Sequence, residues 1–138
     1  MRPSDDLRYD HEVLRAKLAV LEEYLPCFDE VPCIIARTID ALTEGFHDHA
    51  HREAQWLAQG ETAYPLPGPI QQAHDAHDNQ RTRLAVLHAL LHSGGATPRA
   101  QVIAEACGLV KELREHLARE EALFPWIDRG IAWAPSHE

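Results

Sequence analysis

The chain has 138 residues and an acidic balance, with 22 Asp and Glu against 13 Lys and Arg, and its length suits one compact domain. The negative charge argues against nucleic acid or an anionic membrane surface as a partner, and no apolar run approaches the ~18 residues of a bilayer span. Three cysteines without a CxxC pair, and an N-terminus without an apolar signal segment, predict reduced thiols in a cytoplasmic protein.

Proline and glycine divide the chain into four long segments that favour helix, and the alternation typical of strands is absent. We expect helices over about residues 4–25, 32–59, 69–92 and 97–128. Ser4 is a candidate N-cap for the first of them. Residues 1–130 are expected to form a single domain, and residues 131–138 a short C-terminal tail.

Each predicted helix carries an apolar seam whose residues recur at intervals of three and four. The seams consist of Leu7, Leu14, Leu18, Leu21 and Leu25 in the first helix; Ile35, Ile39, Leu42, Phe46 and Leu57 in the second; Ile70, Leu84, Leu87 or His88, and Leu91 in the third; and Val102, Ala106, Leu109, Leu113, Leu123 or Phe124, and Ile127 in the fourth. Four such helices with short links predict an all-α, up-down-up-down antiparallel four-helix bundle.

Every seam is interrupted by polar residues, most of which are good metal ligands. They are His11; His49 and Glu53; His74, His77 and Arg81; and His116 and Glu120. A buried polar group without a partner costs about 1–3 kcal/mol, so several of them in one core need something that satisfies them. In an antiparallel bundle all these positions lie near the same end, roughly 9–14 Å in from it, and therefore in one layer.

Two of the helices repeat the pattern His-x-x-x-Glu, in HAHRE (49–53) and HLARE (116–120). Residues four apart face one side of a helix, so the imidazole and the carboxylate can bind one metal ion or bridge two. Up to five imidazoles and two carboxylates exceed the needs of one tetrahedral zinc ion and suit two bridged first-row ions. Iron leads among these, with zinc as the alternative. No HExxH motif supports a zinc protease, and the single ExxH pair, Glu44 with His47, lies off the seam.

Four stretches resemble the hemerythrin-like, or HHE cation-binding, domain family, and the resemblance covers about residues 10–125. They are DHEVLR (10–15), HAHREAQWL (49–57), GPIQQAHDAHD (68–78) and HLAREEALFP (116–125). The resemblance implies that His11, His49, His77 and His116 bind metal and that Glu53 and Glu120 are the bridging carboxylates. His74 is a further candidate ligand, although it lies three residues from His77, whereas family members commonly space this pair four apart.

The family also implies a non-haem centre of two iron ions with an oxo or hydroxo bridge, which binds or senses O₂, NO or peroxide. An apolar wall of Leu14, Phe46, Leu113 and Leu117 would favour a neutral gas over water and anions. A gas-binding or sensing protein is the leading hypothesis, and a homo-oligomer or a protein partner acting in trans is open. The alternatives are a di-iron oxidase or peroxidase, an iron donor for cluster repair, and a structural bundle that iron or zinc stabilises.

Several histidines and one glutamate are expected to be bystanders. His47 and His51 are rotated to the flanks of the second helix, and Glu121 is expected to be solvated because it lies off the seam. His88 and His92 are four residues apart and could bind an ion, but they lie more than ten residues above the predicted layer, and we interpret them as surface or interface histidines.

Two charged residues of the third helix lie beside the layer. Asp78 is a candidate acceptor that orients an imidazole. Arg81 is expected either to pair with Glu53 or Glu120 or to reach solvent.

Overall fold

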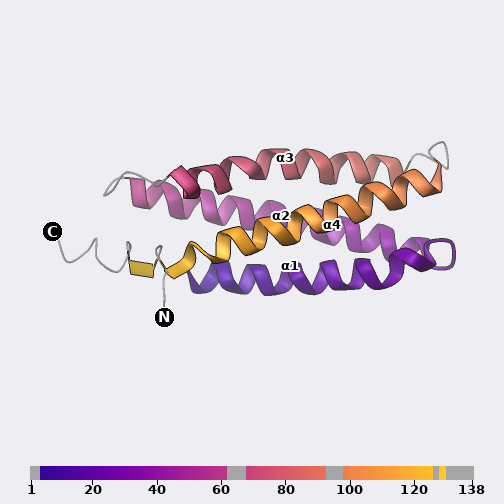
Figure 1. Cartoon of the computed structure of the whole chain (residues 1–138), viewed down its shortest axis with the longest axis horizontal. Coiled ribbons are helices and arrows are strands. Elements are labelled where there is room, and N and C mark those ends of the chain that lie inside the picture. Colours follow the sequence, from indigo (N-terminus) through magenta and orange to yellow (C-terminus); the bar gives the residue numbers. More distant parts are fainter. Residues whose placement is uncertain (1–3, 62–67, 93–97, 126–127, 130–138) are drawn as a thin grey trace.

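Four long antiparallel helices form a bundle in the computed structural model of the chain (Figure 1), as the seams predict. The helices are α1 (Asp5–Tyr24), α2 (Pro32–Glu61), α3 (Gly68–Leu91) and α4 (Arg99–Glu121), and a 3₁₀ turn, η1 (Leu25–Cys27), follows α1. The structure describes residues 4–61, 68–92, 98–125 and 128–129, with the side chains of 56–61, 68–71, 73 and 74 excepted. The predicted boundary at residue 130 and the C-terminal tail lie outside the described residues.

Neighbouring helices in the chain pack side by side, and α1 also contacts α4, which closes the bundle. The start of α1 and the end of α4 lie at the same end of the bundle (Figure 1). His11 and Glu120 are close to these helix ends in the sequence, so the layer of polar residues lies toward this end. None of the described helices carries an apolar stretch long enough to cross a membrane.

The apolar seams form the core, and their side chains are almost completely buried. The buried members include Leu7, Leu14, Leu18, Leu21, Leu25, Ile35, Ile39, Leu42, Phe46, Leu84, Val102, Ala106, Leu109 and Leu113. Leu57, Ile70 and Ile127 lie outside the described side chains. Between the alternatives left open, the structure selects Leu87 over His88 and Phe124 over Leu123.

The third helix differs from the prediction by a small rotation about its axis. Gln80 is buried with 1 % of its surface exposed, whereas Arg81, which we expected in the seam, is exposed. Both residues satisfy the three-and-four spacing from His77 and Leu84, so periodicity cannot separate them. Burying an unpaired guanidinium costs more than burying an amide, and the rotation therefore places Gln80 inside.

The fourth helix ends at Glu121, seven residues earlier than expected, and a turn at Ala122 and Leu123 follows it. Pro125 explains the early end, because its nitrogen has no hydrogen to donate to the carbonyl of Glu121. Helical backbone resumes at Phe124 and Pro125 and is present again at Asp128 and Arg129. After the turn, the described residues of the chain lie near the start of α1, where Asp128 contacts Ser4.

This segment is tied to the start of α1. The Asp128 carboxylate accepts hydrogen bonds from the backbone N–H of Ser4, at 2.8 Å, and from the Arg8 guanidinium, at 3.3 Å. Ser4 occupies the N-cap position, but its side chain makes no capping bond and instead accepts a hydrogen bond from Arg8 Nε at 2.8 Å. Ser4 is thus at the predicted N-cap position, but the negative charge that stabilises this helix N-terminus comes from Asp128.

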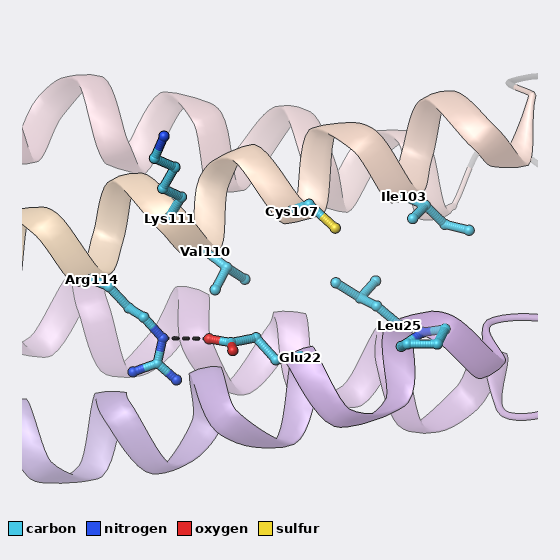
Figure 2. A pocket seen from close by; sticks show the side chains of 8 residues that line it. Glu22, Leu25, Ile103, Cys107, Val110, Lys111 and Arg114 are labelled. Atoms are coloured by element: carbon cyan, nitrogen blue, oxygen red, sulfur yellow. Dashed lines mark hydrogen bonds and ion pairs between the residues drawn. The ribbon is translucent and has the colours of Figure 1, made fainter.

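A groove of about 480 Å³ opens between α1 and α4 at the opposite end of the bundle (Figure 2). An ion pair between Glu22 and Arg114 crosses it, and Cys107 on α4 lines it. All three cysteines are free and exposed in the structure.

Candidate metal centre

Six of the seven predicted site residues meet in one buried layer, to which all four helices contribute. Their exposed fractions are 2 % for His11, 0 % for His49, 5 % for Glu53, 2 % for His77, 0 % for His116 and 3 % for Glu120. The seventh, His74, belongs to the described backbone of α3, but its side chain lies outside the described part of the structure. His47 and His51 are exposed on α2, as predicted.

The carboxylate of Glu120 is the centre of the cluster. Its Oε1 atom lies 3.2 Å from His11 Nε2 and 3.3 Å from His49 Nε2. The same oxygen lies 3.2 Å from His116 Nε2, and the second oxygen lies 3.2 Å from His77 Nε2. Four imidazoles therefore direct the same ring nitrogen at one carboxylate.

Glu53 is the second carboxylate of the layer and faces Glu120. Its oxygens lie 3.4 Å from His49 Nε2 and 3.8 Å from His77 Nε2. Burial and the neighbouring Glu120 carboxylate raise the pKa of Glu53 to about 8. Burial opposes the ionisation of Glu120 too, but Glu53 and the surrounding imidazoles outweigh it and hold the Glu120 pKa well below its usual range. Two buried like charges this close are unfavourable, and in the metal-free protein a proton on Glu53 relieves their repulsion.

These residues fit a metal centre better than they fit a hydrogen-bonded core. Three ring nitrogens surround a single oxygen of Glu120, more than its lone pairs can serve well. Among the described residues, neither ring nitrogen of the buried His116 has a hydrogen-bond partner, since its approach to Glu120 is out of line. His49, Glu53, His77 and Glu120 offer ligand atoms that all lie within 4.8 Å of one another. Metal ions would satisfy all these donors together.

Asp10 on α1 orients His49 from behind. Its Oδ2 atom lies 3.2 Å from His49 Nδ1 and accepts a hydrogen bond of 2.9 Å from Arg52 Nε. Burial disfavours a charged imidazole, but hydrogen bonds to Asp10, Glu120 and Glu53 outweigh it and raise the pKa of His49 to about 11. A carboxylate at Nδ1 fixes the ring and leaves Nε2 for the metal. Asp78, which we expected in such a role, is exposed and paired with Arg81.

Glu121 orients His11 in the same manner, which corrects its interpretation as a solvated charge. Its Oε2 atom lies 3.2 Å from His11 Nδ1 and also accepts a hydrogen bond from Arg15. Burial raises the pKa of the Glu121 carboxyl, but Arg15 and His11 outweigh this effect and lower it. The two histidines of α1 and α2 thus share one arrangement, in which an arginine holds a carboxylate and the carboxylate holds Nδ1.

The histidines of α3 and α4 lie in a more apolar environment. The rings of His77 and His116 meet edge to face with centroids 4.9 Å apart, and the Phe46 ring lies 5.3 Å from His77. Burial lowers the pKa of His77. Gln80, one turn along α3, is buried with no hydrogen bond to its Oε1 atom from any described residue. The sequence offered no signal for Gln80, because Arg81 fits the same spacing.

One phenylalanine ring lies on each side of the layer along the bundle axis. Phe46 lies on the side of the main core, within 6.4 Å of His49 and 6.5 Å of His116 between centroids. Phe124 lies on the side of the open end, 5.0 Å from the His11 ring, and the Arg8 guanidinium stacks over it. The turn after α4 places Phe124 there, so the early end of the helix helps to close the site.

Every helix of the bundle contributes a buried histidine to one layer, and α2 and α4 each add a glutamate, which is the arrangement of a cation-binding helical bundle. The chain matches the family model of the hemerythrin HHE cation-binding domain over residues 2–127, and it belongs to that family. Neither the search of curated proteins nor the search of solved structures gave a match.

Proposed function

We propose that the buried layer holds two iron ions and that the protein binds or senses a small diatomic gas, O₂ or NO. The observation that carries the proposal is the convergence of four imidazole Nε2 atoms on Glu120, with Glu53 beside it. Four nitrogen donors and two carboxylates are enough for two first-row ions that share bridging ligands, and the mixture suits iron. Family membership supports a cation in this place.

The geometry of the donors supports the ligand roles that the family resemblance implies. His11, His49, His77 and His116 each present one nitrogen and would bind at the outside of the centre. Glu53 and Glu120 each present two oxygens to the space between the helices and would bridge. Bound ferrous iron would supply electrons and an open coordination position for a diatomic ligand.

The surroundings of the layer favour a small neutral ligand. Leu14, Phe46, Leu113 and Leu117, which we expect to form an apolar wall, are buried with at most 3 % of their surface exposed. Such a wall disfavours water and anions, because ions are costly to transfer into an apolar space. Asp10 and Glu121 hold two of the imidazoles in place, so the donors are preorganised rather than assembled by the metal.

An anaerobic ferrous titration of the purified chain tests the metal centre. We expect a break near two iron ions per chain, and His51→Ala, an exposed position of α2, should behave like the unmodified protein. A break at one ion, or preference for zinc with no iron bound, would contradict the proposal.

The second measurement follows the response of the iron-loaded protein to gases. O₂ or NO should change the visible absorption spectrum, and dithionite should reverse the change caused by O₂. Binding without sustained consumption of the gas supports a binding or sensing role. Steady turnover of O₂ or peroxide that is lost in Glu53→Ala would instead identify an enzyme.

A further inference from the structure

Three exposed residues, far from the buried layer, form a second group of metal-ligand type. They are Asp40 on α2 and His88 and His92 at the end of α3, and their ligand atoms all lie within 4.8 Å of one another. Asp40 is nine residues from His49, which places it about 13 Å along α2 from the buried layer. We propose that Asp40, His88 and His92 bind a divalent transition-metal ion of the zinc class at the surface.

The geometry at this place is that of a chelate across two helices. His88 Nδ1 lies 2.7 Å from Asp40 Oδ1, and the His88 and His92 rings lie with centroids 4.3 Å apart. Two histidines four residues apart on a helix point to the same side, so both imidazoles reach one ion. The carboxylate comes from the neighbouring helix and completes a set of two nitrogens and one oxygen.

The type of donor selects the class of metal. Zinc takes three protein ligands of this kind together with one exchangeable position, whereas Mg²⁺ and Ca²⁺ prefer oxygen donors alone. The side chains of His88 and Asp40 are 48 % and 50 % exposed, so small movements can bring the three atoms to bonding distance.

Two further observations favour a cation here. His88 lies in the last turn of α3 and His92 follows its end, where the carbonyl end of the helix dipole attracts positive charge. An open groove of about 620 Å³ is lined by Asp40 and His88 together with Glu44 and His47. The groove gives a metal ion access from solvent and leaves room for a water or another ligand in the remaining position.

A bound ion would join the end of α3 to the first third of α2. The interpretation of His88 and His92 as surface histidines is right about their location, but it leaves out Asp40, which no helical periodicity connects to them.

Amide NMR spectra of the full chain during titration with Zn²⁺ test the site at residue resolution. We expect changes at the amides of Asp40, Thr43, Ala85 and His92 that saturate with one equivalent. In His88→Ala/His92→Ala these changes should disappear, while Asp40→Asn should weaken the binding by about tenfold or more. All three side chains are exposed, so the variants should keep the fold.

The controls separate this site from the buried layer. Mg²⁺ should cause no such changes, and His51→Ala should respond like the unmodified protein. His116→Ala, which alters the buried layer, should leave the surface response intact whatever metal the layer binds. An unchanged response in His88→Ala/His92→Ala, or no Zn²⁺ response at these four amides in the unmodified chain, would overturn the proposal.

Discussion

The protein carries two groups of histidine and carboxylate side chains that use the same chemistry in opposite environments. The six residues of the buried layer are at most 5 % exposed, and carboxylates behind the rings orient two of its histidines, His11 and His49. In the surface group, Asp40, His88 and His92 are exposed, and a single contact of 2.7 Å joins the two helices.

The difference between the two groups lies in what a missing partner costs. In the core, each unsatisfied donor or acceptor lowers the stability of the fold by about 1–3 kcal/mol. The buried group therefore needs metal ions, protons or neighbouring side chains as partners at all times. At the surface, water satisfies the same atoms, and metal binding must compete with water and with side-chain freedom. We therefore expect tight, preorganised binding in the core and weaker binding at the surface.

The largest effect is expected from Glu120→Gln, because Glu120 touches all four histidines. The amide keeps the shape of the side chain but loses the charge and one oxygen donor. Iron affinity in the core should therefore fall by about 100-fold or more, a larger loss than for a residue that only orients a ligand. Metal titration of the two proteins measures the effect. The Zn²⁺ response at His88 should be unchanged, and a joint loss at both places would mean that the variant is misfolded.

The next comparison divides the histidines of α2. His49→Ala removes a buried donor and should abolish metal binding or reduce it to half, whereas His47→Ala and His51→Ala should leave the core stoichiometry nearly intact. Iron content after anaerobic loading distinguishes the three variants. Equal losses in all three would show that the apolar seam does not select the ligand.

A smaller effect is expected from the two carboxylates behind the rings. Asp10→Asn weakens the contact with His49 Nδ1 and should lower metal affinity by about 10–100-fold. Glu121→Gln should cost less, because the Glu121 side chain is 37 % exposed and water can replace it. Metal affinity and the melting temperature of the metal-free protein should be measured together. If both variants lost only melting temperature, these carboxylates would be structural and would not support the ligands.

The smallest effect concerns the contact that closes the open end of the bundle. Burial would raise the pKa of Asp128, but contacts with Ser4 and Arg8 outweigh it and lower the pKa below its ordinary 3.8. Because the pKa of Asp128 is lower in the folded state, its ionised carboxylate stabilises the fold fully above the ordinary pKa of 3.8. This stabilisation disappears as the pH falls through the folded-state pKa. Asp128→Asn should therefore cost about 1 kcal/mol near neutral pH and little in strong acid. Urea unfolding at several pH values measures this, and a loss that does not change with pH would exclude the ionic contribution.

Most of the fold could be predicted because helix periodicity is a local property. The described leucines and isoleucines of the α1 and α2 seams are buried as expected, and the two His-x-x-x-Glu patterns place His49, Glu53, His116 and Glu120 in the core. These features depend only on spacing along one helix. The chain belongs to the family that the same stretches resemble.

The misses have a common cause, since each depends on how one helix is turned toward another. Asp10 and Glu121 were not expected behind His49 and His11, and these partners are 39 and 110 residues apart in sequence. Gln80 replaces Arg81 in the core because α3 rotates by a fraction of a turn. No spacing rule reports such rotations.

The sequence by itself indicated four amphipathic helices and six of the buried residues of the polar layer, because side chains three and four apart must share a face. Only the tertiary structure decided which atoms meet. It turned Nε2 of four imidazoles toward Glu120, brought Asp128 back to Ser4, and placed Asp40 beside His88. Apart from His116 and Glu120, which are four residues apart on α4, these contacts join residues that the chain separates by tens of positions. Packing between helices rather than periodicity within them sets their distances.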